Sequence, residues 1–159
     1  MGDDGRGNAD NPGVITTPPY FYAGALVMGL LANRRLRLPL LPRRLARTLG
    51  LLVTVGGFAV GLLGLRELRR AGTNVDPYKP ATIVVTGGPY RLTRNPMYLG
   101  FTLMYVGISA LSNALPPLVL LPVVQHLMRR GVIEREERYL ENKFGEEYLQ
   151  YKVSVRRWL

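Results

Sequence analysis

The chain contains no cysteine, and His126 is the one histidine among its 159 residues. Without thiols it has no disulfides, thiolate metal sites or cysteine nucleophile. A single histidine also argues against a histidine-based metal site or a Ser/His dyad. We therefore predict chemistry that requires neither a bound metal nor a covalent intermediate, and the set of predicted metal ligands is empty.

Formal charge is absent from one long stretch, because no Asp, Glu, Lys or Arg occurs between Asn95 and Met128. Such a stretch is long enough to cross a bilayer, turn and return. Ser112–Pro117 would form the uncharged turn between a span beginning at Pro96 and a span over Leu118–Met128. The polar blocks before and after this hairpin are then expected on one side of the membrane.

Acidic residues are scarce relative to basic ones, and the formal net charge is +10. Binding to nucleic acid would require the basic residues to share a water-exposed face that also carries aromatic residues for stacking. Here the arginines instead border apolar runs, which is typical of helix ends held at lipid headgroups. We therefore predict membrane lipids as partners and no nucleic acid. The bordering residues are Arg34, Arg35, Arg37, Arg66, Arg69, Arg70, Arg129 and Arg130.

Two further apolar stretches precede the hairpin, at Pro18–Ala32 and Thr48–Leu65. Gly57 and Gly61 in the second stretch are spaced for close helix packing. The predicted fold class is all-α: an integral-membrane helical bundle of about four spans with a C-terminal cytosolic amphipathic helix. We expect a disordered tail over residues 1–13, N-terminal spans over 14–70 and a catalytic region over 71–159.

The topology of the bundle contains a conflict. The uncharged turn favours the outer side, which places both termini and the polar segment Arg66–Arg94 in the cytoplasm. Four spans then leave Arg34–Arg47 outside, against the positive-inside rule. Either the first span does not cross fully or the hairpin overrides the local arginines. We favour four spans with both termini inside.

The segment Arg66–Arg94 is polar and interrupted by proline and glycine, with one β-like run at Ala81–Thr86. Long non-helical segments in compact proteins tend to be functional.

The C-terminal tail predicts an amphipathic helix, bent at Gly145, with a single apolar stripe. Glu137 is the exception on this stripe, and burying its carboxylate costs free energy unless it meets a cation or donors. Either Glu137 forms a structural ion pair with Arg91 or Arg94, or Glu136 or Glu137 faces a ligand. The stripe comprises Ile133, Glu137, Leu140, Phe144, Tyr148, Tyr151 and Val155.

Arg94-Asn95-Pro96-Met97-Tyr98 marks the start of the third span. Taken singly, these residues are typical of an ordinary interfacial helix start, because proline suits the first helical turn. Pro89 and Pro96 also restrict the backbone between them, and helix N-termini attract carboxylates and phosphates. Together with a neighbouring carboxylate, this pattern favours a pocket for a zwitterionic ligand.

The blocks GPYRLTRNPMYLG and IEREERYLENKFGEEYLQYKVSVRRWL resemble the integral-membrane methyltransferases of the isoprenylcysteine carboxyl methyltransferase and phospholipid N-methyltransferase group. The resemblance covers Ala71–Leu159. It implies that S-adenosylmethionine binds at the cytosolic face and that a lipophilic small molecule, lipid or prenylated acceptor arrives from the bilayer. It also implies Arg94 and Glu137 as catalytic residues. The implied cofactor-binding residues are Tyr90, Arg94, Asn95, Pro96, Tyr98, Leu99, Glu136 and Glu137.

One position departs from the family pattern, which usually has histidine where this chain has Asn95. Asparagine can donate and accept hydrogen bonds but cannot titrate. Tyr148 and Tyr151 are expected to pack the tail, and Arg156 and Arg157 to face the acceptor or lipid headgroups.

The sequence therefore predicts methyl transfer to a lipophilic carboxylate, amine or thiol at the cytosolic face of a prokaryotic plasma (inner) membrane. Direct displacement at a sulfonium depends on positioning and electrostatics, and the faces of Tyr90 and Tyr98 could stabilise that cation. Two alternatives stay open. One is a nicotinamide-dependent membrane reductase of the sterol-reductase type, and the other is a non-enzymatic membrane scaffold.

Overall fold

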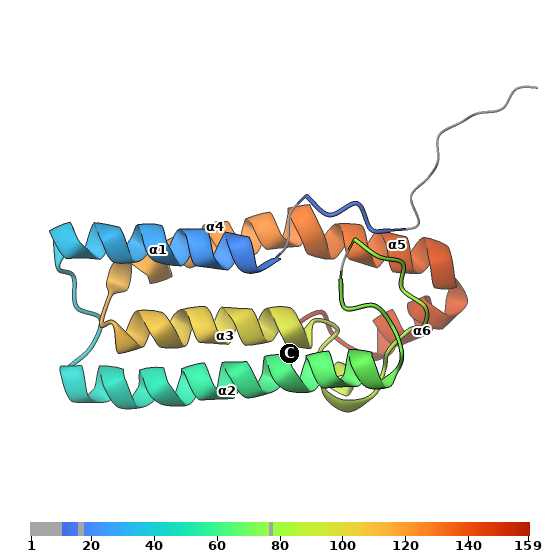
Figure 1. Ribbon diagram of the computed structural model, residues 1–159, viewed down its shortest axis with the longest axis horizontal. Helices are drawn as coiled ribbons and strands as arrows, with labels where there is room; N and C mark the ends of the chain where they lie inside the picture. The colour runs from blue at the N-terminus through green and yellow to red at the C-terminus, as the bar shows by residue number, and fades with distance from the viewer. Residues whose placement is uncertain (1–10, 16–17, 77) are drawn as a thin grey trace, which may run out of the picture.

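The computed structural model describes residues 11–15, 18–76 and 78–159, which are all-α (Figure 1). Its four long helices are followed by two shorter ones. A 3-10 turn lies between the second and third long helices, and a π turn joins the fourth long helix to the first short one. In chain order the elements are α1 (Pro18–Leu36), α2 (Arg43–Arg70), a 3-10 turn (Gly88–Arg91), α3 (Pro96–Leu111), α4 (Leu115–Met128), a π turn (Arg129–Ile133), α5 (Glu134–Phe144) and α6 (Glu146–Ser154).

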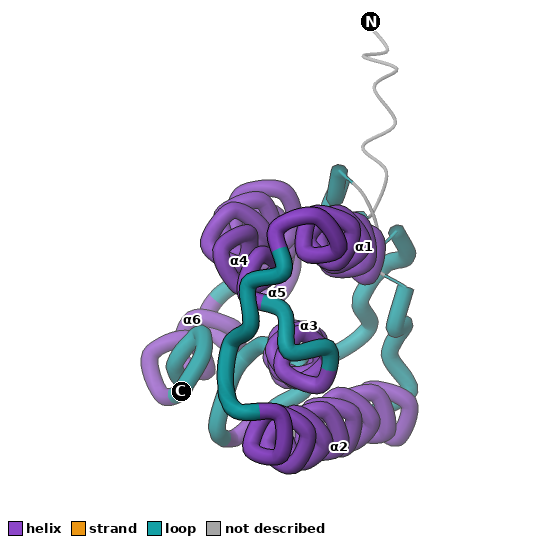
Figure 2. The backbone as a smooth tube through the Cα atoms, turned by 90° about the vertical axis from the view of Figure 1, so that its left-hand side faces the viewer, coloured by secondary structure: helices purple, strands orange, loops and turns teal. Residues whose placement is uncertain are grey.

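The four long helices form two layers, α1 beside α4 and α2 beside α3 (Figures 1 and 2). The polar segment between α2 and α3 lies with α5 and α6 at one end of this bundle. Pro96 occupies the first turn of α3, as the sequence predicts. The expected β-like run at Ala81–Thr86 is wrong, because this stretch forms no strand and instead lines the end of the bundle as irregular backbone.

Glycines bring α2 and α3 into backbone contact. A Cβ atom added at Gly57 would lie 2.7 Å from the Met104 amide nitrogen, and one added at Gly100 would lie 2.8 Å from the Gly57 carbonyl oxygen. Any larger side chain would push the helices apart, because such separations are below van der Waals contact. The predicted packing role of Gly57 is confirmed, and α3 of the same chain occupies that face.

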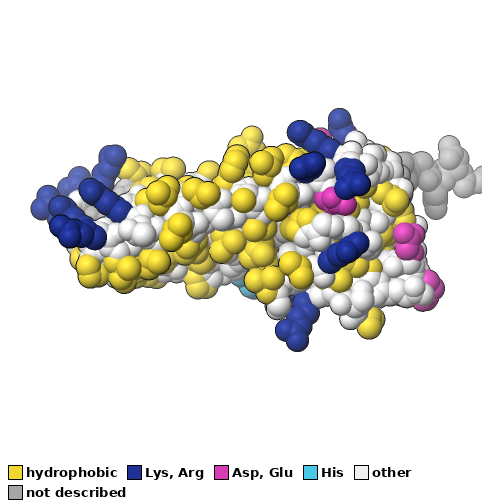
Figure 3. Space-filling model, turned by 90° about the horizontal axis from the view of Figure 1, so that it is seen from below, with side chains coloured by type: hydrophobic (Ala, Val, Ile, Leu, Met, Phe, Trp, Pro, Cys, Tyr) yellow, Lys and Arg dark blue, Asp and Glu magenta, His cyan; other side chains and the backbone are white. Residues whose placement is uncertain are grey.

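The face of the bundle seen in Figure 3 is apolar between two charged ends. On α2, Leu52, Phe58 and Leu62 are more than half exposed. At about 1.5 Å per residue, the 28 residues of α2 extend roughly 42 Å. This is close to the roughly 40–45 Å of a bilayer with its headgroups. Among the described helices, α2 is long and apolar enough to cross a membrane, and α3 is a shorter apolar helix.

The C-terminal tail bends where the sequence predicts. Gly145 separates α5 from α6 with φ 54° and ψ −126°, a conformation that favours glycine. All seven positions of the predicted apolar stripe are buried or half-buried, including Glu137, whose exposure is 5%. The disordered tail predicted for residues 1–13 falls mostly outside the described residues, although Arg135 donates a hydrogen bond to the Gly13 carbonyl oxygen.

Candidate functional site

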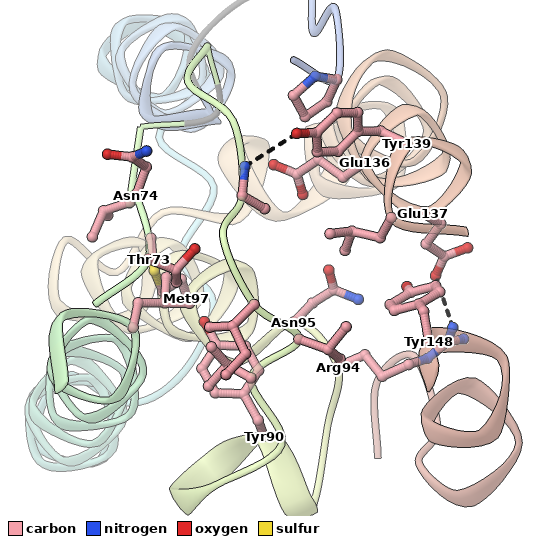
Figure 4. Close-up of a pocket in the computed structure, with 18 of the residues that line it drawn as sticks. Thr73, Asn74, Tyr90, Arg94, Asn95, Met97, Glu136, Glu137, Tyr139 and Tyr148 are labelled. Atoms are coloured by element: carbon pink, nitrogen blue, oxygen red, sulfur yellow. Dashed lines mark hydrogen bonds and ion pairs between the residues drawn. The ribbon is translucent and has the colours of Figure 1, made fainter. Parts of the chain in front are cut away.

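A cavity opens at the polar end of the bundle, between the 73–85 segment, the first turn of α3, and helices α5 and α6 (Figure 4). The space between its walls, including its open mouth, is about 930 Å³. Met97 and Ile133 contribute apolar side chains to the lining, whereas Arg94, Glu136 and Glu137 contribute charged ones. The lining of the cavity therefore combines apolar and charged side chains.

The segment before α3 is held in place by the C-terminal tail. Pro89 lies in the first turn of the 3-10 helix that carries the buried Tyr90, and the Tyr151 hydroxyl donates a hydrogen bond to the Tyr90 carbonyl oxygen at 2.8 Å. The Arg94 amide donates to the Arg156 carbonyl oxygen at 3.0 Å. Residues distant in sequence are thus fixed at one wall of the cavity.

Glu137 is buried between two guanidinium groups. Arg157 donates from Nε to Oε1 at 2.9 Å and from Nη2 to Oε2 at 2.6 Å, and the hydrogen bond with Glu137 raises the pKa of Arg157. Arg94 Nη1 lies 3.4 Å from Oε1. Of the two structural partners considered from the sequence, Arg94 is correct and the exposed Arg91 is wrong. The stronger partner, Arg157, could not be found from the stripe, because it lies in the non-helical end of the tail.

Arg94 presents donors that the fold leaves unused. Its side chain is 9% exposed, and its Nε and Nη1 atoms are buried without a hydrogen-bond partner among the described residues. The ion pair with Glu137 compensates the charge of Arg94, but burying donors that make no hydrogen bond still costs free energy. The side chain lines the cavity beside Tyr148 (Figure 4), whose pKa burial raises to about 12 against the opposing effect of Arg94. A ligand oxygen in the cavity would satisfy these donors.

Asn95 anchors the end of the tail. Its Nδ2 donates a hydrogen bond to the Arg157 carbonyl oxygen at 3.0 Å, and the Thr93 hydroxyl donates to the same oxygen at 3.0 Å. These bonds hold the backbone of Arg157 where its guanidinium reaches Glu137. The resemblance leads us to expect histidine at this position. In this chain the side-chain amide of Asn95 instead holds the backbone of the tail.

Glu136 has surroundings unlike those of its neighbour. Its Oε1 accepts a hydrogen bond from the Tyr98 hydroxyl at 2.6 Å. Burial raises the pKa of Glu136 to about 7, the Tyr98 hydrogen bond lowers it, and the charge on Glu137 raises it. Burial also raises the pKa of Tyr90, and nearby Glu136 adds to that increase. Glu136 is therefore poised to exchange a proton near neutral pH.

Of the residues that the resemblance implies, all but one line the cavity. Leu99 does not line it, although Pro96, Met97 and Tyr98 of the same helical turn do. The polar segment before α3 was predicted to be functional, and residues within 73–76 and 79–85 supply much of one wall of the cavity. Its lining residues, including Ile83 and Val84, were missed because the backbone is irregular and has no periodic pattern. The residues brought together are Tyr90, Arg94, Asn95, Pro96, Tyr98, Glu136 and Glu137. Their roles stay predictions.

Comparison with known proteins supplies the family. A family model described as "Phospholipid methyltransferase" matches residues 45–147, more than half of the chain. "Cobalt-zinc-cadmium resistance protein CzcN" of Cupriavidus metallidurans is 34% identical over 96 residues, which are 60% of this chain and 44% of that protein. "Protein-S-isoprenylcysteine O-methyltransferase A" of Arabidopsis thaliana is 38% identical over 73 residues, which are 45% of this chain and 36% of that protein.

A stretch of 27 residues, 17% of this chain, is 70% identical to an uncharacterized protein of Haemophilus influenzae and covers 43% of it. The chain thus spans less than half the length of these relatives. No solved structure matches. The family match includes all of α3 and all of α5, which both line the cavity. Because the match covers more than half of the chain, the chain belongs to the phospholipid methyltransferase family.

Proposed function

We propose that this protein transfers a methyl group from S-adenosylmethionine to a lipophilic acceptor at a membrane face. Membership of the phospholipid methyltransferase family supports the reaction class. The observation that carries the proposal is the Arg94 guanidinium in the cavity wall, whose buried Nε and Nη1 atoms make no hydrogen bond within the described residues.

The residues of the cavity fit this cofactor. The guanidinium of Arg94 offers hydrogen bonds to a carboxylate, a charge-assisted pairing that is strong in a buried setting. Tyr90 and Tyr98 line the same cavity, and aromatic rings attract a cation such as a sulfonium. When bound, S-adenosylmethionine supplies an electrophilic methyl group on that sulfonium.

The protein's own contribution is positioning and exclusion of water. Arg157 makes both hydrogen bonds to the Glu137 carboxylate. Arg94 lies within 3.4 Å of the same carboxylate, but its Nε and Nη1 donors remain available for hydrogen bonds to a ligand. The 73–85 segment covers one side of the cavity, where the Ala81 amide donates to the Tyr139 hydroxyl at 3.1 Å (Figure 4). A direct displacement gains most of its acceleration from such orientation of the reactants.

We further propose that α1–α4 all cross the membrane and that the site faces the cytoplasm of a prokaryotic cell. The apolar surface on the face seen in Figure 3 and the length of α2 support this arrangement. Met97 and Ile133 line the cavity with apolar side chains, against which the chain of a lipid-like acceptor would pack. Acceptors compatible with this lining include a lipid, a prenylated molecule or another lipophilic small molecule.

The printed name of the Cupriavidus relative refers to metal resistance. In the described part of this chain, no three His, Cys, Asp or Glu side chains gather as a metal ion would require. We therefore do not extend metal binding to this chain.

Calorimetric titration of the detergent-solubilised protein tests the proposal. We expect S-adenosylhomocysteine to bind and NADPH to give no heat. Binding of NADPH alone would support the reductase, and binding of neither would favour a scaffold. Incubation with methyl-labelled cofactor and membrane lipids should then place label in a lipophilic product, and absence of labelled product in spite of cofactor binding would refute catalysis.

A further inference from the structure

The segment that precedes α1 borders the cavity. Residues 12–15 run beside the junction of α4 and α5 (Figure 1), and Pro12 belongs to the cavity lining. Val14 is 6% exposed and is buried in one cluster with Tyr98 and Ile133, which also line the cavity. We call residues 12–15 the strap. The strap lies outside the residues that the family model matches, so membership of the family does not explain its place at the cavity.

Two hydrogen bonds join the strap to the helices within the described residues. The Ile15 amide donates to the Gly131 carbonyl oxygen at 3.2 Å, and Arg135 Nη1 donates to the Gly13 carbonyl oxygen at 2.8 Å. Gly131 belongs to the π turn, and π turns inside helices are frequent at functional sites. The Ile15 side chain is 64% exposed, so the burial of Val14 is the main apolar anchor of the strap.

The 73–85 segment, which lines the same cavity, is tied down more firmly. The Thr82 amide donates a hydrogen bond to the Thr73 hydroxyl at 3.0 Å, inside the segment. The Asn74 side chain donates another to the Pro80 carbonyl oxygen at 2.8 Å, and the hydrogen bond from the segment to α5 described above adds a third. Segments with fewer anchoring contacts open at a lower cost in free energy. The strap is therefore the part of the lining that opens most readily.

The charged groups of the cavity have little contact with water. The Arg94 side chain is 9% exposed, and Glu137 beside it is buried. A charged ligand has to pass from water to these buried groups. Movable segments commonly admit ligands to such sites and then close to exclude water. A site of this kind thus requires a segment that opens, and the strap is the segment with the weakest attachment.

We infer that the strap is a lid on the cavity. In the open form, Val14 leaves its place in the core and the two hydrogen bonds to the strap break, which admits S-adenosylmethionine and releases its product. In the closed form, Pro12 and Val14 seal one side of the cavity. A bound ligand stabilises the closed form because it contacts the closed lining. The inference rests on the proposed function.

Thiol labelling measures the lid directly, because the chain contains no cysteine. Three single variants of the detergent-solubilised protein are treated with a water-soluble maleimide in the absence of ligand. Val14→Cys places the thiol under the strap, Ile15→Cys on its exposed side, and Val132→Cys at a fully buried position of the π turn. We expect Ile15→Cys to react fastest, Val14→Cys to react roughly 10-fold or more slowly, and Val132→Cys to stay unlabelled while the protein is folded.

The labelling rate of Val14→Cys has two results that would overturn the inference. A rate as slow as that of Val132→Cys would make the strap a fixed part of the core, and a rate as fast as that of Ile15→Cys would mean that no closed form exists. Saturating S-adenosylhomocysteine should slow the labelling of Val14→Cys at least about 10-fold, because the ligand stabilises the closed form. Equal rates with and without bound ligand would contradict closure over the ligand.

An engineered disulfide tests whether exchange of the ligand requires the opening. A Cβ atom added at Gly131 would lie 3.9 Å from the Cβ atom of Ile15, and a separation of about 3.5–4.5 Å suits a disulfide. Ile15→Cys/Gly131→Cys should therefore lock the strap when oxidised. We expect association of labelled S-adenosylhomocysteine to slow about 10-fold or more in the locked protein and to recover on reduction. Gly131→Cys alone, treated in the same way, is the control, and unchanged association in the locked protein would overturn the inference.

A weakened anchor should have the opposite effect on the lid. Val14→Ala removes buried methyl groups, so the open form should be populated roughly 10-fold more and S-adenosylhomocysteine should dissociate faster by the same factor. Val153→Ala is the matched control, because Val153 on α6 is 90% exposed. Equal dissociation rates in the two variants would contradict the role of Val14.

Failure of the lid and failure of the proposed function give different results. If the wild type binds no S-adenosylhomocysteine, the proposed function is wrong. Labelling of the ligand-free cysteine variants still decides in that case whether the strap opens.

Discussion

The ion pairs around Glu137 connect the tail to the segment before α3, and their removal should destabilise the protein unequally. Glu137 is the shared anion of Arg94 and Arg157. Glu137→Gln leaves two guanidiniums without an anion, whereas Arg157→Ala leaves a carboxylate that still has Arg94 within 3.4 Å. We therefore expect the change at Glu137 to cost more than the change at Arg157.

The magnitudes follow from burial. Breaking a buried pair by removing one partner costs roughly 3–5 kcal/mol, which we expect for Glu137→Gln. The Arg157 side chain is 27% exposed, so solvent screens it, and its loss should cost about 2–3 kcal/mol. At roughly 2–4 °C per kcal/mol for a chain of this size, Glu137→Gln should lower Tm by about 6–20 °C.

A double-mutant cycle in one detergent provides the assay. Tm and denaturant unfolding are measured for the wild type, each single variant and the combined variant. Because both changes remove the same contact, the combined loss should fall short of the sum by about 1–3 kcal/mol. Strict additivity, or a greater loss for Arg157→Ala than for Glu137→Gln, would refute this reasoning.

Two further predictions concern packing and protonation. Gly57→Ala should destabilise the protein by about 1–3 kcal/mol, because the added Cβ would collide with α3. The control is Gly56→Ala, whose Cβ would enter open space, and it should be neutral or stabilising by up to about 1 kcal/mol. Denaturant unfolding measures both, and equal effects would contradict the close α2–α3 contact. Folding raises the pKa of Glu136 from 4.5 to about 7. The protonated carboxyl therefore contributes to the stability of the folded protein, and this contribution is complete below pH 4.5 and is lost as pH rises through 7. Glu136→Gln should therefore be about 1–3 kcal/mol more stable than the wild type at pH 8 and similar to it at pH 4.5, and a pH-independent difference would argue against the raised pKa.

Features with a strong local cause could be predicted from the sequence. Pro96 restricts the start of α3, Gly145 permits the bend between α5 and α6, and the heptad-like spacing of the tail identifies its buried face. The identity of Glu137 as a buried acid followed from the same spacing, because a carboxylate on an apolar stripe requires a partner.

Features that depend on tertiary contact could not be predicted. Arg157 follows the last helical residue of α6, and it reaches Glu137 because Thr93 and Asn95 hold its carbonyl oxygen. The β-like run at Ala81–Thr86 has the composition of a strand, but no neighbouring strand is available to pair with it in the described residues. Its side chains instead pack at the cavity, where local propensity gives way to tertiary packing.

The central claim is that Arg94 binds the cofactor, and calorimetry with S-adenosylhomocysteine tests it most directly. Losing charge-assisted hydrogen bonds costs about 1.5–3 kcal/mol, so Arg94→Ala should weaken binding roughly 10- to 100-fold. Arg91→Ala, an exposed change in the 3-10 turn, should bind like the wild type. Unchanged affinity in Arg94→Ala, with the fold intact by circular dichroism, would contradict the account.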